Sequence, residues 1–110
     1  MLIITGDDIK LTRGDSLIVE LELEKGGETY TPQQGDSLRF AVSTGYKGQV
    51  GYTLHISKPI SPEDLVIHLD PEDTEDLAYK KYHYDVEMTY VDGEVDTCLS
   101  GDFELTGDVE

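Results

Sequence analysis

Tyr82-His83-Tyr84-Asp85-Val86-Glu87-Met88-Thr89-Tyr90-Val91-Asp92-Gly93-Glu94-Val95 is the stretch of sequence that decides the fold. Large apolar or aromatic side chains occupy every second position from Tyr82 to Tyr90, and polar side chains occupy the positions between. This period of two is typical of a β-strand with one face in the core and the other in water. Asp92-Gly93 follows at once, and Asp-Gly between two alternating runs favours a β-hairpin. The stretch therefore predicts two antiparallel strands joined by a tight turn.

The same alternation recurs along most of the chain, in both directions from this stretch. It is longest in residues 16–24, where leucine and valine alternate with glutamate and other residues. Lys25-Gly26-Gly27-Glu28 predicts a second hairpin turn, and the three glycines between residues 45 and 51 predict a loop. Shorter alternating runs predict further strands at residues 38–42, 52–56, 65–69, 95–99 and 103–105.

One stretch has the features of a helix start rather than of a strand. In Asp70-Pro71-Glu72-Asp73, an N-cap residue precedes proline at the first position and acids in the first turn. We expect one helical turn there, among eight or nine short strands with regularly spaced turns. The pattern predicts an all-β sandwich or barrel that forms a single domain over residues 1–110.

Two facing sheets satisfy all the alternating runs at once, which predicts the core. Tyr82 or Tyr84 is expected to donate its hydroxyl hydrogen to a loop carbonyl, as in the tyrosine corner of Greek-key sandwiches. The side chains predicted to share one interior are Leu17, Val19, Leu21, Phe40, Leu54, Ile67, Tyr84, Val86 and Leu99.

Composition excludes several classes of partner. The 110 residues include 24 acidic and 8 basic ones, for a net charge of -16. Such a chain lacks the clustered lysine and arginine that bind nucleic acid or anionic membranes. Cys98 is the single cysteine, so no internal disulfide forms and a reducing compartment fits better than secretion. The apolar start is too short for a signal peptide, and no apolar run reaches transmembrane length.

Two short motifs suggest activities that the rest of the sequence does not support. Gly-Asp-Ser-Leu, a signature of serine esterases, occurs at Gly14-Asp15-Ser16-Leu17 and at Gly35-Asp36-Ser37-Leu38. Those enzymes need a partner histidine and asparagine groups, yet the sequence contains no asparagine and no matching late histidine element. Both copies are therefore interpreted as turns leading into strands. The adhesion tripeptide Arg13-Gly14-Asp15 overlaps the first copy and receives the same interpretation.

Neither a metal site nor a catalytic site is predicted. The acidic residues 70–76 lack the central glycine of an EF-hand loop and fit a capped helical turn better. His55, His68 and His83 fall on the outer faces of separate predicted strands, and isolated surface histidines are the default interpretation. Cys98 has no patterned partner for a thiol nucleophile. We therefore expect no enzymatic activity, no cofactor and no metal.

The segment around the glycine-rich loop is the best candidate for a contact surface. No acidic residue occurs between Val42 and Ser61, which makes this the least acidic part of an acidic chain. Tyr46, Lys47 and Tyr52 are the residues expected to bind a partner, because exposed tyrosine is a common anchor at protein interfaces.

Several short stretches form a set that extends over nearly the whole chain. Most combine a turn with the first residues of a strand, and the set opens with Arg13-Gly14-Asp15-Ser16 ahead of a long alternating strand. The stretches are residues 9–16, 35–42, 69–74, 82–87, 93–97 and 101–105.

This set resembles small proteins from phages and prophages of Gram-positive bacteria. It is similar to the immunoglobulin-like N-terminal domain of phage upper baseplate proteins, which occupy the tail tip and anchor receptor-binding parts. The resemblance implies an immunoglobulin-like antiparallel β-sandwich with one short helical turn.

The resemblance also implies a non-enzymatic structural component of a phage or prophage particle, in the tail or baseplate. Such a component would dock to other phage structural proteins, and would lie in the virion after passing through the host cytoplasm. Isolated, the chain is expected to be monomeric or weakly associated, because Glu20, Glu22 and Glu24 discourage self-pairing. The alternative is a bacterial binding module that recognises a carbohydrate or a surface protein.

Overall fold

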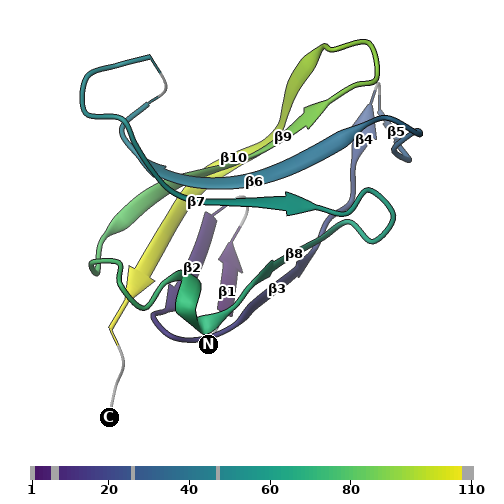
Figure 1. The fold of residues 1–110 in the computed structure, drawn as a ribbon. Helices are drawn as coiled ribbons and strands as arrows, with labels where there is room; N and C mark the ends of the chain where they lie inside the picture. Colours follow the sequence, from purple (N-terminus) through teal and green to yellow (C-terminus); the bar gives the residue numbers. More distant parts are fainter. Residues whose placement is uncertain (1, 6–7, 26, 47, 108–110) are drawn as a thin grey trace.

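The computed structural model describes residues 2–5, 8–25, 27–46 and 48–107. Within these residues the chain forms strands in two layers, with one short helical turn (Figure 1). The first layer is a six-stranded sheet in the order β1-β2-β10-β9-β6-β7. Its strands are β1 (Leu2–Thr5), β2 (Asp8–Thr12), β6 (Ser37–Thr44), β7 (Thr53–Ile60), β9 (Lys81–Thr89) and β10 (Val95–Thr106).

The second layer is smaller and pairs β3 (Leu17–Glu20) with β8 (Val66–Leu69). A short hairpin, β4 (Glu24–Lys25) with β5 (Glu28–Thr29), continues the chain beyond β3 at the predicted glycine turn. The 3-10 turn η1 (Pro71–Asp73) follows β8, at the predicted helical position. The prediction of an all-β sandwich with one short helical turn is confirmed.

Strand order explains the likeness to immunoglobulin domains. The order β10-β9-β6-β7 corresponds to strands G, F, C and C′ of a variable-type domain, and the β3–β8 pair corresponds to B and E. One pair departs from the predicted antiparallel arrangement, because β2 runs parallel to β10, with Ile9 opposite Phe103. A hairpin cannot make this pair, so it joins residues that are far apart in the sequence.

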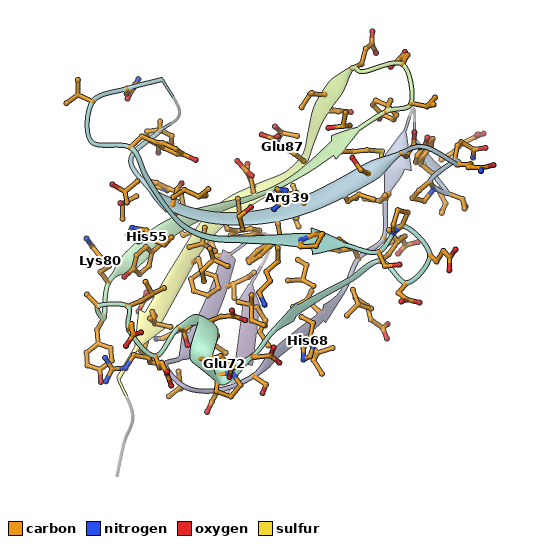
Figure 2. The ribbon with its side chains drawn as sticks, viewed as in Figure 1. Arg39, His55, His68, Glu72, Lys80 and Glu87 are labelled. Carbon is orange, nitrogen blue, oxygen red and sulfur yellow. The ribbon has the colours of Figure 1, made fainter. Side chains whose placement is uncertain are left out.

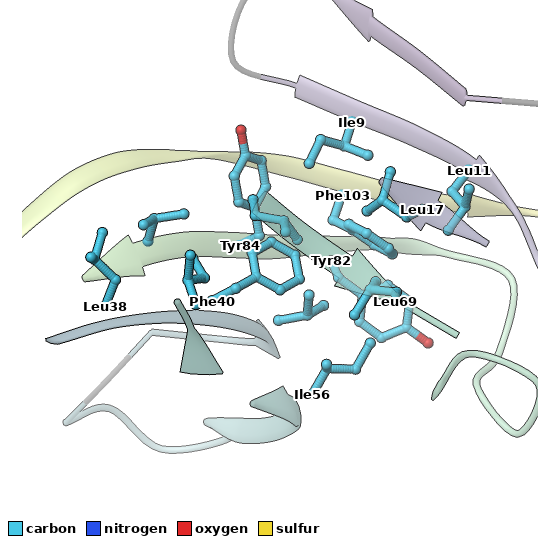
Figure 3. Close-up of a cluster of buried hydrophobic side chains, with 14 of the residues drawn as sticks. Ile9, Leu11, Leu17, Leu38, Phe40, Ile56, Leu69, Tyr82, Tyr84 and Phe103 are labelled. Atoms are coloured by element: carbon cyan, nitrogen blue, oxygen red, sulfur yellow. The ribbon is translucent and has the colours of Figure 1, made fainter. Parts of the chain in front are cut away.

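The stretch that opened the sequence analysis forms the centre of the core. Tyr82, Tyr84, Val86 and Met88 on β9 are each at most 3 % exposed, as the alternation predicts. Neighbouring strands of the first layer and the β3–β8 pair of the second enclose these side chains (Figure 3). Of the predicted core, Val19, Leu21 and Leu99 are only partly buried and pack against the buried cluster.

Local turn chemistry fixes both ends of β9. Before the strand begins, the Tyr82 hydroxyl donates to the Ala78 carbonyl at 2.8 Å, which confirms the predicted tyrosine corner. After it ends, Tyr90 and Glu94 close the hairpin through the Tyr90 N–H and the Glu94 carbonyl, 2.8 Å apart. The Asp92 side chain accepts the Glu94 N–H at 2.9 Å. The predicted Asp-Gly hairpin is therefore confirmed.

The core prediction is wrong at Leu54, which is 49 % exposed. Val42 on β6 lies opposite Ile56 on β7, but the next residue, Ser43, lies opposite Leu54. His55 is therefore an extra residue in β7, a β-bulge that reverses the faces of the residues before it. Leu54 lies opposite outward-facing Ser43, while the His55 ring meets the edge of the buried Tyr82 ring at 5.1 Å. The His55 side chain is nevertheless exposed, as the sequence predicts.

Candidate functional site

The face of the six-stranded sheet that points away from the second layer is the candidate site. Alternate residues of β6 and β9 project from it, because successive side chains on a strand point to opposite faces. The register places Arg39 opposite Glu87, Ala41 opposite Asp85 and Ser43 opposite His83. Figure 2 shows Arg39 and Glu87 on this side of the sheet. We call this surface the outer face.

Two connections rise beside the outer face, one at each end. The loop between β6 and β7 curls up at one end, and the β9–β10 hairpin extends at the other (Figure 1). Within the loop, the Gln49 N–H donates to the Tyr46 carbonyl at 3.1 Å, and the Tyr52 N–H donates to the Gln49 carbonyl at 3.3 Å. These successive turns confirm the predicted loop and bring Tyr46 and Tyr52 to the edge of the outer face.

The predicted partner-binding residues differ in the exposure and the contacts of their side chains. Tyr46 is 61 % exposed, and its ring stacks on the His83 ring with centroids 4.6 Å apart and 25° between the planes. Tyr52 is half-buried beside it. Lys47 lies outside the described residues. Tyr46 therefore has an exposed ring held by a neighbour on the sheet, which suits a pre-positioned contact.

A hollow of about 350 Å³ lies between the loop and the sheet. Both tyrosine rings line it, together with His83, Asp85 and Asp102. A smaller hollow of about 80 Å³ lies next to it and shares Tyr52 and Asp85 with the first. We call the two hollows together the outer trough. Its chemistry combines aromatic surface with carboxylates and hydroxyl groups.

Charged groups in and around the outer trough are partly paired with one another. The Asp102 carboxylate lies 3.6 Å from His83 Nδ1 and 4.0 Å from Lys81 Nζ. Arg39 Nη1 donates to Ser57 Oγ at 2.5 Å across the β6–β7 pair. Exposed Leu54 also lines the smaller hollow and adds apolar surface between these groups. The face therefore has the mixed character of a protein interface, with apolar contacts inside a polar rim.

Sequence reasoning identified Tyr46 and Tyr52 but missed Leu54 and Asp102. The alternation predicts Leu54 in the core because the bulge at His55 leaves no mark in it. Asp102 comes from β10, and only the register of β10 with β9, which places Asp102 opposite His83, brings it to the trough. The alternation of β10 could have placed Asp102 outward, since Phe103 is inward, but not next to Tyr46.

The two Gly-Asp-Ser-Leu copies lie away from the outer trough. Ser16 directly precedes β3, and Ser37 is the first residue of β6. Both side chains are exposed, and neither lines the trough. Their position confirms the interpretation as turns leading into strands.

The adhesion-like tripeptide is held against the body of the domain. The Arg13 guanidinium lies 4.2 Å from the centre of the Tyr79 ring, within cation–π distance. The Gly14 N–H donates to the buried Thr74 hydroxyl at 3.2 Å. These contacts tie the turn to the segment after η1, so packing explains the motif.

Carboxylates in the acidic residues 70–76 act within the fold. Asp73 accepts the Asp70 N–H at 2.8 Å and lies 3.0 Å from Lys58 Nζ. The hydrogen bond to Asp73 raises the pKa of Lys58. Within the described residues, no group of three or more His, Cys, Asp or Glu side chains is arranged to hold a metal ion. No helix among those residues has both the length and the apolar character to span a membrane.

Comparison with known proteins finds no matching family model, no matching curated protein and no matching solved structure. The fold and the outer face are thus the basis for a functional proposal.

Proposed function

We propose that the chain is a non-enzymatic structural component of a phage or prophage particle, in the tail or baseplate. It docks to other particle proteins through the outer face. The observation that carries the docking role is Tyr46, a 61 % exposed ring at the rim of the outer trough. The assignment to a phage particle rests on the resemblance of the turn-and-strand motifs to baseplate domains.

Stacking on His83 makes Tyr46 an effective anchor. An aromatic side chain that already has a neighbour on one face loses less conformational freedom when a partner covers it. Exposed Leu54 lies along the same trough and widens the apolar contact. A few such residues carry most of the energy of a typical interface. The Tyr46 end of the outer face is therefore the expected centre of binding.

Charge favours a partner other than a second copy. The chain carries a net charge of -16, and Asp85, Glu87 and Asp102 lie on the outer face. Two such faces would repel one another, whereas a basic surface would be attracted over a distance of about 8–10 Å at physiological salt. The isolated chain is therefore monomeric or weakly associated and meets its partner during assembly in the host cytoplasm.

Incorporation into particles tests this proposal. An epitope-tagged chain is expressed during phage or prophage induction, and particles are purified by density gradient. We expect the tag to band with the particles, and Tyr46→Ala to reduce incorporation roughly tenfold or more without lowering the melting temperature. Ile18→Ala is the matched control, since Ile18 is 62 % exposed on β3 of the opposite layer.

Two results would contradict different parts of the proposal. A tag that never bands with particles would contradict the virion role. Equal incorporation of Tyr46→Ala and wild type would move the docking site away from the outer face. A lowered melting temperature for Tyr46→Ala would show that the ring contributes to folding.

The hollow beside Tyr46 supports a second candidate, a module that binds a carbohydrate. Tyr46 and Tyr52 offer ring surfaces for the apolar face of a sugar, and Asp85 and Asp102 offer acceptors for its hydroxyl groups. Binding to bacterial cell-wall glycans on an array, lost in both Tyr52→Ala and Asp102→Asn, would favour this candidate. An array without binding would remove it.

A further inference from the structure

Within the described residues, β10 has a neighbouring strand on only one edge over the first half of its length. β9 pairs with β10 from Val95 to Glu104, on one edge. On the other edge, β2 pairs only with residues 103–106. Within the described residues, no strand pairs with this second edge over residues 95–101. The Asp8 carboxylate accepts the Asp102 N–H at 3.0 Å, just where the pairing with β2 stops.

A hollow of about 200 Å³ lies beside this edge, between the two layers. Thr97 and Leu99 line it from β10, and Leu21 and Leu23 line it from the chain that continues β3. Its remaining walls are mostly buried or half-buried side chains of the core, including Tyr30, Val86 and Met88. The volume is several times the roughly 30 Å³ of one liquid water, which is room enough for side chains of another segment.

The opposite wall of the hollow is formed by residues 21–23, the stretch that directly follows β3. β3 pairs with β8 on one side, and within the described residues no strand pairs with its other side. The backbone continues along this wall, where the Leu21 N–H donates to the Leu65 carbonyl at 2.7 Å. Within the described residues, no strand fills the space between β10 and residues 21–23. We call it the edge slot.

We infer that the edge slot receives an extended segment of a second protein, which adds as a strand to β10. Its backbone would pair with residues 95–101, and every second side chain would enter the hollow. Strand addition of this kind takes its affinity from main-chain hydrogen bonds and its specificity from pockets for alternate side chains. The edge slot shares Thr97 alone with the lining of the outer trough, and it does not depend on the proposed function.

Charge defines the remaining side chains of the added segment. Glu22 and Asp96 line the hollow, and Asp92 and Glu94 lie in the hairpin just before β10. Side chains that point away from the hollow would meet this acidic surface, so lysine or arginine fits there. The segment therefore alternates apolar with basic residues. The long alternating run of residues 16–24 in a second copy would place Glu20 and Glu22 at those positions, where they would meet like charge.

An irregularity in β10 limits how the segment pairs. The register with β9 shifts between Thr97 and Leu99, which marks a β-bulge. Bulges on edges discourage pairing with arbitrary strands. The regular parts on either side, residues 95–97 and 99–101, are each three residues long. The added strand must match both, which makes the slot selective.

A peptide titration tests the inference at 0.15 M salt. The probe is a nine-residue peptide in which valine or isoleucine alternates with lysine. Its controls are a peptide of equal composition with the apolar residues contiguous, and the probe N-methylated at its central residues. We expect the probe to bind, each control to bind at least tenfold more weakly, and hydrogen exchange to slow at residues 95–101.

Two variants complete the test. Leu99→Trp, which fills the hollow, should weaken probe binding at least tenfold, whereas Leu54→Trp on the outer face should not. Near-UV circular dichroism checks that each variant folds; if Leu99→Trp does not, the N-methylated peptide still decides. No binding up to 1 mM, equal binding of any control, or protection elsewhere would each overturn the inference.

Discussion

The same four residues, Gly-Asp-Ser-Leu, occur twice in this molecule and have the same local geometry at both places. Gly14 and Gly35 have φ angles of 89° and 96°, which few residues other than glycine adopt. In each copy an exposed serine follows the aspartate, and the leucine is buried, at 0 % for Leu17 and 4 % for Leu38. The tetrapeptide by itself therefore encodes a turn that starts a strand.

The two aspartates show what the tetrapeptide does not encode. Asp36 is only 7 % exposed, and its carboxylate accepts hydrogen bonds from the Tyr30 hydroxyl at 2.6 Å, the Gln33 N–H at 2.8 Å and the Val91 N–H at 3.1 Å. Asp15 is half-buried at the other turn. At the second copy, the aspartate thus also fastens the β9–β10 hairpin to the turn.

Truncation of the two leucines should have the largest effect and should be similar at both copies. Leu17→Ala and Leu38→Ala each remove a buried side chain from the same core. We expect each to lower the free energy of unfolding by about 2–5 kcal/mol. Urea denaturation measures both. A difference of more than about 3 kcal/mol between the two would show that the copies are not equivalent even in packing.

Removal of the second carboxylate should separate the copies. Asp36→Ala leaves the Tyr30 hydroxyl and the Val91 N–H without their acceptor, and should lower the free energy of unfolding by about 3 kcal/mol. Asp36→Asn keeps one acceptor oxygen and should lower the free energy of unfolding by a smaller amount. Hydrogen exchange should speed up at the Val91 amide in both variants. An Asp36→Ala variant as stable as the wild type would contradict the fastening role.

Substitution of alanine for each of the two glycines should lower the free energy of unfolding by different amounts, and this difference should be smaller than the one expected at the aspartates. Both substitutions place a side chain at positive φ, which costs about 1–2 kcal/mol. A Cβ at Gly35 would also lie 2.7 Å from Val91 Cγ2, whereas a Cβ at Gly14 has nothing within 4 Å. Gly35→Ala should therefore cost about 1–3 kcal/mol more than Gly14→Ala.

A double substitution checks the cause of that difference. Val91→Ala combined with Gly35→Ala should recover the added cost, since Val91 is 71 % exposed and contributes little to the core. Additive effects in this double-mutant cycle would show that the clash with Val91 is not the cause.

Alkaline pH should have the smallest effect, and only at the second copy. The hydrogen bond to Asp36 raises the pKa of Tyr30 to about 12, from an ordinary value of about 10. Between these values the unfolded chain has lost the Tyr30 proton and the folded chain keeps it, so stability falls as pH rises. Urea denaturation at pH 8, 10 and 11 should show this fall, and Tyr30→Phe should reduce it.

A residual fall in Tyr30→Phe has a second source. Burial raises the pKa of Tyr82 as well, and that residue is unchanged in the variant. Identical slopes for Tyr30→Phe and the wild type would show that the Tyr30–Asp36 bond does not shift the proton equilibrium.

Much of the fold follows from the sequence because its causes are local. The alternation of Tyr82 to Tyr90 identifies the central strand, Asp92-Gly93 its hairpin, and Asp70-Pro71 the helical turn. The tyrosine corner also follows, since Tyr82 lies at the start of its strand and reaches a carbonyl four residues earlier. In each case, residues close in sequence determine the geometry.

The rest depends on contacts between distant residues. The bulge at His55 comes from how β7 meets β6, and it reverses Leu54 without altering the hydrophobic period. The stacking of Tyr46 on His83 requires a loop and a strand about 37 residues apart to meet, and no local pattern encodes it. The tyrosines therefore locate the candidate site in the sequence, but the sequence does not predict which other residues they meet there.

The parallel pairing of β2 with β10 has a consequence for synthesis in the cell. Ile9 cannot meet Phe103 until the ribosome has added the residues between them, which takes about 5–20 s at ordinary elongation rates. During that interval β10 cannot yet pair with β2, so that edge of β2 lacks its neighbouring strand. Contacts of such long range also slow folding after release. The nascent chain therefore exposes apolar surface that favours aggregation until synthesis is complete.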